Sequence, residues 1–135
     1  MTLLYEDETF KIRGVLFDVW NELGPGFLEK IYKRALLEEL KKQNIPYKTE
    51  EKYKIYYNQK LIGYNKIDIT VYKKIILELK AVNKLEKFHL SQVLAYLKAT
   101  GFKLGLLINF GAEKLEIKRV INQKSKISPR TTRVF

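Results

Sequence analysis

Apolar residues recur at helical spacing in three segments of this 135-residue chain. The first segment carries an apolar stripe made of Ile12, Leu16, Val19 and Leu23. This spacing predicts helices over residues 6–22, 27–43 and 85–100. Helix-breaking residues follow each of them, namely Gly24-Pro25-Gly26, then Asn44 and Pro46, and finally Gly101.

Five shorter runs are typical of strands, because apolar residues alternate or cluster in them. They cover residues 52–57, 60–72, 74–82, 103–109 and 114–121. The pairs Asn58-Gln59 and Tyr72-Lys73 separate the first three runs and are the expected hairpin turns. The segment from Lys103 to Asn109 is a compact apolar strand, whereas the last run alternates.

The order of elements is helix, helix, three strands, helix, two strands. It predicts an α/β fold in which helices flank a mixed central sheet. Residues 1–122 form one predicted domain, since the length suits a single core and no repeat is present. Residues 123–135 carry four basic side chains and no acidic one, and are predicted to be a loosely held basic tail.

Composition restricts the chemistry. The chain has no cysteine, which excludes disulfides and thiolate zinc sites, and His89 is its single histidine. Any metal must therefore be held by oxygen ligands, which favours magnesium, manganese or calcium over zinc. The first residues run directly into Glu6-Asp7-Glu8, unlike a signal peptide, and no apolar run approaches membrane-spanning length. We expect a cytoplasmic protein without a membrane partner.

The net charge of +11 is unevenly distributed. Residues 1–50 hold eight Lys and Arg against nine Asp and Glu, whereas residues 51–135 hold 18 against six. A strongly basic region attracts polyanions with salt-sensitive affinity, which favours a nucleic-acid partner. The alternative is that the lysines serve only solubility.

Charged residues interrupt the apolar strand over residues 74–82. Glu78 and Lys80 share one strand face, because alternate side chains point to opposite sides. Asp68 lies four residues before the Tyr72-Lys73 turn and on the face opposite Ile67, Ile69 and Val71. This spacing predicts that Asp68 and Glu78 are near neighbours across a hairpin, or one diagonal apart. Two such carboxylates repel each other unless a cation or a proton lies between them, so they are candidate metal ligands.

Two helices add inward-pointing polar residues. In the third helix, Gln92, Tyr96 and His89 lie opposite the charged stripe and need hydrogen-bond partners. In the second helix, Glu29 shares the apolar arc of Tyr32 and is therefore expected to point toward the core. The helix dipole favours a carboxylate at that position.

Each of these residues also has a structural interpretation. Glu78 and Lys80 would make an ion pair on an edge strand, and Glu29 would be a first-turn acid favoured by the dipole. Gln92 and Tyr96 would be buried polar residues bonded to the backbone. For His89, a satisfied helix histidine is favoured over a metal ligand.

The segment from Gly26 to Tyr32 resembles the signature of the GxxExxY family. Asp68, Glu78-Leu79-Lys80 and Gln92-Val93-Leu94-Ala95-Tyr96 resemble the corresponding elements of the PD-(D/E)XK nuclease superfamily, as does Asn109-Phe110-Gly111. The resemblance implies a restriction-endonuclease-like αβββαβ core with a mixed sheet. It further implies that Asp68, Glu78, the Leu79 backbone carbonyl and Glu29 bind Mg²⁺. Lys80 would activate a water molecule, and Gln92 with Tyr96 would contact phosphate or support the site.

The resulting hypothesis is an Mg²⁺-dependent nuclease that hydrolyses phosphodiester bonds, with DNA as substrate and Mn²⁺ as an alternative ion. The chief alternative is a nucleic-acid-binding module without catalysis. A third is a nuclease subunit that cuts only as a homodimer or within a larger complex.

Overall fold

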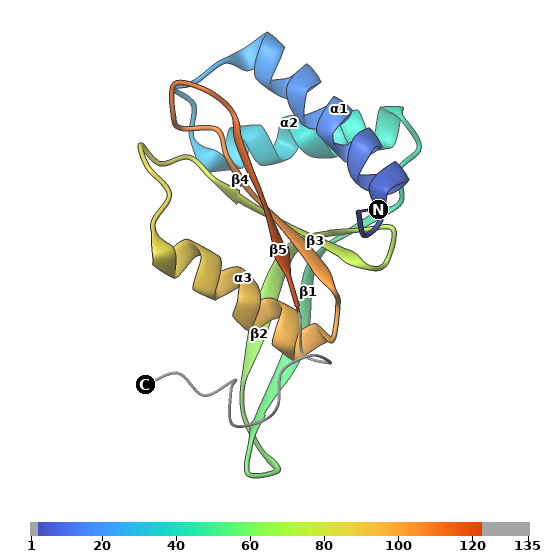
Figure 1. Cartoon of the computed structure of the whole chain (residues 1–135), viewed down its shortest axis with the longest axis vertical. Helices are drawn as coiled ribbons and strands as arrows, with labels where there is room; N and C mark the ends of the chain where they lie inside the picture. Colours follow the sequence, from blue (N-terminus) through green and yellow to red (C-terminus); the bar gives the residue numbers. More distant parts are fainter. Residues whose placement is uncertain (1–2, 123–135) are drawn as a thin grey trace.

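In the computed structural model, which describes residues 3–122, a mixed five-stranded sheet is covered by helices on both faces (Figure 1). The predicted α/β fold is confirmed, while the predicted tail at residues 123–135 lies outside the described residues. The elements in chain order are α1 (Glu6–Leu23), α2 (Glu29–Lys42), β1 (Tyr47–Tyr57), β2 (Lys60–Val71), β3 (Ile75–Lys80), α3 (Lys87–Thr100), β4 (Leu104–Asn109) and β5 (Glu116–Ile121).

The strands lie in the order β1-β2-β3-β4-β5, the same as in the sequence. Neighbouring strands are antiparallel except β3 and β4, which are parallel. A parallel pair needs a crossover connection, and α3 supplies it. None of the helices in residues 3–122 is long and apolar enough to cross a membrane.

Several elements begin later or earlier than predicted. Helix α2 begins at Glu29, two residues after the prediction, because Gly26 has φ 111° and Leu28 is extended. Helix α3 begins at Lys87 because the extended Glu86 caps it. Strand β1 begins at Tyr47, five residues before the prediction, because pairing with β2 extends the strand through the polar segment before residue 52.

The two faces of the sheet carry separate apolar clusters. Leu77 and Leu79 of β3 belong to the cluster under α1 and α2, together with Ile12, Leu16, Leu36, Leu40, Leu106 and Ile108. Ile76 belongs to the cluster under α3, together with Val93, Leu97 and Leu107. Glu78, which alternates with Leu77 and Leu79, is thus directed away from the α1–α2 cluster.

Both predicted hairpin turns are present without glycine. Asn58 and Gln59 have φ of 47° and 66°, and Tyr72 and Lys73 have φ of 55° and 59°. Positive φ at both central residues is the conformation that suits the right-handed twist of paired strands. The second turn fixes the register of β2 against β3, with Ile69 opposite Leu77.

Strand β2 does not keep the predicted alternation around Asp68. Ile69 and Val71 pack in the α1–α2 cluster, but Ile67 packs in the cluster under α3. The expectation that all three share one face is therefore wrong. Pairing of β2 with β3 ends at Ile69, and Glu50, which lies opposite Asp68 on β1, has φ 59°. A left-handed residue bends the strand there, and β2 continues with β1 as a separate hairpin (Figure 1).

Gly105 allows α3 to lie close to β4, and we expect Gly105→Ala to lower the free energy of unfolding by about 1–3 kcal/mol. A Cβ at residue 105 would lie 2.6 Å from Cγ1 of Val93. Gly63→Ala is the matched control, since a Cβ there meets no atom within 4 Å. Urea unfolding measures both variants, and equal stabilities would contradict the close approach.

Candidate functional site

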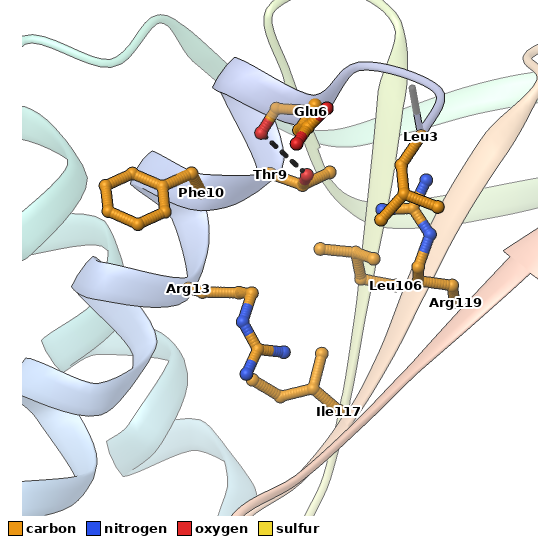
Figure 2. A pocket seen from close by; sticks show the side chains of 8 residues that line it. All are labelled: Leu3, Glu6, Thr9, Phe10, Arg13, Leu106, Ile117 and Arg119. Carbon is orange, nitrogen blue, oxygen red and sulfur yellow. Dashed lines mark hydrogen bonds between the residues drawn. The ribbon is translucent and has the colours of Figure 1, made fainter. Parts of the chain in front are cut away.

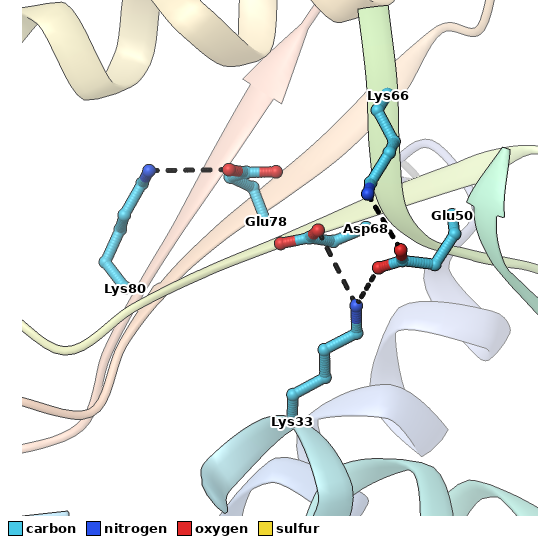
Figure 3. A network of polar contacts seen from close by, with 6 residues as sticks. All are labelled: Lys33, Glu50, Lys66, Asp68, Glu78 and Lys80. Atoms are coloured by element: carbon cyan, nitrogen blue, oxygen red, sulfur yellow. Dashed lines mark hydrogen bonds and ion pairs between the residues drawn. The ribbon is translucent and has the colours of Figure 1, made fainter. Parts of the chain in front are cut away.

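Three carboxylates occupy one row across three adjacent strands. Pairing of β2 with β3 ends at Ile69 and Leu77, so Asp68 and Glu78 are the next residues of the two strands, and the charge of Asp68 acts on Glu78. On the other side of β2, the pairs Thr49–Ile69 and Glu51–Ile67 place Glu50 opposite Asp68. Figure 3 shows the row, with Asp68 between the other two. The sequence predicted the proximity of Asp68 and Glu78 but not the position of Glu50.

Glu78 is the buried member of the row. Glu78 is only 4% exposed, and its Oε2 atom lies 3.4 Å from the Lys80 ammonium. Its Oε1 atom is buried and has no hydrogen-bond partner in the described part of the chain. Burial raises the pKa of Glu78 to about 7; the Lys80 charge opposes this rise and the Asp68 charge adds to it. The site therefore accommodates a proton or a cation beside Glu78.

Lys80 is held between β3 and α3. Its ammonium donates a hydrogen bond to Oε1 of Gln92 over 2.9 Å, and the Gln92 amide donates to the Tyr96 hydroxyl over 3.0 Å. Burial and the Glu78 charge raise the pKa of Tyr96. The structure thus brings together four of the predicted residues in one connected group: Glu78, Lys80, Gln92 and Tyr96.

Asp68 is paired with a lysine that the sequence analysis missed. Lys33 of α2 lies 3.6 Å from Oδ1 of Asp68 and 2.8 Å from Oε2 of Glu50. Lys66 lies 2.9 Å from Oε1 of Glu50, so the two lysines hold the pKa of Glu50 at about 2 (Figure 3). The i,i+4 spacing of Glu29 and Lys33 was the available signal, because it places them on the same side of α2.

Glu29 is exposed, so the expectation that it points into the core is wrong. As the first residue of α2, it lies one turn before Tyr32, where the apolar stripe begins. It is nevertheless electrostatically coupled to the group: partial desolvation raises its pKa, the Lys80 charge lowers it and the Asp68 charge raises it.

Residues 3–122 contain no set of three or more His, Asp and Glu side chains arranged to hold a metal ion. Mg²⁺ does not need such a cage, because it keeps several waters and binds one or two carboxylates together with substrate phosphates. The pair Asp68 and Glu78, with an unpartnered buried oxygen on Glu78, is compatible with that mode of binding. His89 is not part of the pair: its Nδ1 accepts a hydrogen bond from the Glu86 backbone, as the structural interpretation predicted.

The end of β3 is fixed by Asn109 of β4. The Asn109 amide accepts hydrogen bonds from the backbone N–H groups of Val82 and Gly111 and donates to the Val82 carbonyl. The Phe110 N–H donates to the Lys80 carbonyl. A Cβ at Gly111 would lie 2.3 Å from the Val82 nitrogen, so only glycine fits. These contacts keep the backbone of Lys80 in place.

Tyr32, the tyrosine of the sequence signature, is buried away from the carboxylates. Its ring stacks on Phe110 at 4.5 Å, and its hydroxyl donates to the Gly24 carbonyl over 2.6 Å. The same hydroxyl accepts a hydrogen bond from the Phe27 N–H. The signature therefore joins the turn before α2 to the end of β4, and contributes to the site through the placement of α2.

A mainly apolar pocket lies elsewhere, between α1 and strands β4 and β5 (Figure 2). Its lining residues are Leu3, Glu6, Thr9, Phe10, Arg13, Leu106, Ile117 and Arg119. Arg119 donates to the Leu4 carbonyl and thereby anchors the start of α1. None of the predicted site residues lines this pocket.

The model of the family described as "PD-(D/E)XK nuclease superfamily" matches residues 6–120. The crystal structure of a protein named SSO0001 is similar with a TM-score of 0.56 and 18% identity, covering 72% of this chain and 52% of that one. The present chain thus spans about half of that protein, and the likeness concerns the fold alone. The comparison with curated proteins gave no match.

The raised pKa of Glu78 predicts that the free energy of unfolding falls as the pH rises from 4.5 to about 7. In this window the unfolded chain has released the Glu78 proton while the folded chain still binds it, so each rise in pH favours unfolding. The full effect is about 3 kcal/mol at most. Glu78→Gln should abolish this component, whereas the exposed Glu113→Gln should keep it.

Urea unfolding of the three proteins across this pH range tests the prediction. The decisive quantity is the difference in unfolding free energy between wild type and Glu78→Gln as a function of pH. A difference that does not change with pH would show that Glu78 titrates normally.

Proposed function

Because the chain belongs to the PD-(D/E)XK nuclease superfamily, we propose that it is a metal-dependent nuclease that hydrolyses phosphodiester bonds in DNA. The observation that carries the proposal is the buried Glu78 carboxylate, with one unpartnered oxygen, opposite Asp68. Such an arrangement is costly for a structural ion pair, because a lysine reaches only one of the two Glu78 oxygens. It is the expected state of a ligand set whose cation arrives from solution.

Asp68 and Glu78, with the Leu79 backbone carbonyl, are the proposed ligands of Mg²⁺, and Glu29 is proposed to complete the set; Mn²⁺ is the alternative ion. Oxygen donors of this kind suit these hard cations. A bound divalent cation lowers the pKa of a water molecule and neutralises charge on the scissile phosphate. In the absence of a cation, Lys33 partly neutralises Asp68.

Lys80 is the proposed residue that orients the attacking water. Gln92 accepts one hydrogen bond from its ammonium, which leaves the other N–H groups of the ammonium for Glu78 and a water molecule. Tyr96 fixes the Gln92 amide, so that the carbonyl side of that amide faces Lys80. Gln92 and Tyr96 therefore act as positioning residues and as candidate phosphate contacts.

The basic charge of residues 51–135 supports a polyanionic substrate. The Gly-x-x-Glu-x-x-Tyr segment further suggests the GxxExxY family within the superfamily. Two alternative functions are also compatible with superfamily membership. The first is a protein that binds nucleic acid without cutting it, and the second is a nuclease subunit that cuts only as part of a complex. The following experiment separates the proposal from a protein that only binds nucleic acid and from one that cuts only as an oligomer of this chain.

We expect purified protein to cleave plasmid, linear or single-stranded DNA in the presence of Mg²⁺ or Mn²⁺. Glu78→Gln should reduce the rate by about 100-fold or more, because several kcal/mol of charge stabilisation are lost. Glu113→Gln, which changes an exposed acid outside the row, should cleave like wild type.

A second readout separates catalysis from cation binding. Mg²⁺ should raise the thermal unfolding midpoint of wild type but not that of Glu78→Gln. Light scattering identifies the oligomeric states of the protein, and each of them is assayed. If every state binds DNA but none cleaves it with Mg²⁺ or Mn²⁺, the proposed nuclease is refuted and the binding module is favoured.

A further inference from the structure

The hairpin formed by the distal parts of β1 and β2 extends beyond the helices that cover the rest of the sheet (Figure 1). Residues 52–66 of this hairpin contain four lysines and no acidic residue. The register places Lys52 opposite Lys66 and Lys54 opposite Tyr64. Cross-strand partners point to the same side of a hairpin, so Lys52, Lys54 and Lys66 form one basic strip that also contains Tyr64.

Three tyrosines of the hairpin are exposed. Tyr56, Tyr57 and Tyr64 have 57%, 66% and 56% of their surface accessible, and Leu61 and Ile62 beside them are exposed as well. Tyr53 differs, because it packs edge-on against Phe102 under α3. A cluster of large exposed aromatic residues between lysines marks a binding surface.

The basic strip leads to the carboxylate row. Lys66 is two residues from Asp68 along β2, at the point where the hairpin leaves the part of β2 that pairs with β3. Lys66 contacts Glu50, which shares Lys33 with Asp68. A chain lying along the hairpin would thus arrive at Asp68.

We propose that this hairpin binds a single-stranded segment of nucleic acid by stacking bases on its tyrosines and pairing phosphates with its lysines, and that it directs that segment to Asp68 and Glu78. The inference rests on the proposed function and names the substrate class. Unpaired bases expose both ring faces for stacking, whereas the bases of a duplex do not. A second copy of the chain is a poor occupant, because its own lysines would oppose the same charges.

The test measures fluorescence anisotropy of labelled oligothymidine in the Glu78→Gln protein, so that binding is observed without cleavage. Tyr56→Ala, Tyr57→Ala and Tyr64→Ala should each weaken binding by about fivefold or more where the ring stacks on a base. Tyr64→Phe keeps the aromatic face and should bind like the parent protein. Phe10→Ala is the control, since Phe10 is an aromatic residue on α1 that is at least as exposed as the three tyrosines.

The lysines give an independent readout. Replacing Lys52, Lys54 and Lys60 by alanine should make the slope of log affinity against log salt shallower by about 2, since each phosphate contact on a single strand contributes about 0.7. Lys66 is left unchanged because it also contacts Glu50. The matching oligothymidine duplex should bind more weakly than the single strand.

The outcomes distinguish this inference from the nuclease proposal. Unchanged affinity in all three tyrosine-to-alanine variants, or stronger binding of the duplex than of the single strand, overturns the role of the hairpin even if wild type cleaves DNA. Tyrosine-dependent binding of the single strand supports the hairpin even if no cleavage is found. Circular dichroism confirms that the variants keep the fold.

Discussion

The buried charge of Glu78 is the constraint on which the arrangement of this molecule depends. Its neighbours along β3 are buried and apolar, and Asp68 opposite carries the same charge. Burial of an acid among such residues is tolerated only where cations approach from nearby. Lys80 approaches from β3 itself, and Lys33 approaches Asp68 from α2. The contacts of Tyr32 fix the position of α2, and that position brings the Lys33 ammonium to the Asp68 carboxylate.

The two sides of the sheet contribute different properties to the site. Helix α3 supplies neutral hydrogen-bonding groups, Gln92 and Tyr96, which orient Lys80. Helix α2 supplies charge, through Lys33 and the exposed Glu29. Strand β2 pairs with β3 only from Ile69 to Val71. Asp68, the residue before Ile69, therefore lies at the junction between the central sheet and the projecting hairpin.

Local pattern predicted much of this arrangement. The Tyr72-Lys73 turn fixed the register, so counting residues from it was enough to place Asp68 beside Glu78. Lys33 and Glu50 could not be found in this way, because their contacts join α2 to β1 and depend on tertiary packing. Ile67 was assigned to the wrong face because regular alternation was assumed through a position where the opposite residue, Glu50, is left-handed. For Glu29 the helical wheel gave the correct side of α2, but it contains no information on where the core ends along the axis.

The parallel pairing of β3 with β4 has a consequence for the order in which the chain folds. The hairpins of β1, β2 and β3 involve nearby residues and close at low entropic cost, whereas β4 reaches β3 only after α3 has crossed the sheet. We therefore expect Glu78 to stay hydrated in the early hairpins and to lose its water when α3 and β4 dock. On this expectation the docking of α3 and β4 carries the electrostatic cost of burying Glu78, so the last part of the fold to assemble would also be the part that is sensitive to protons and cations.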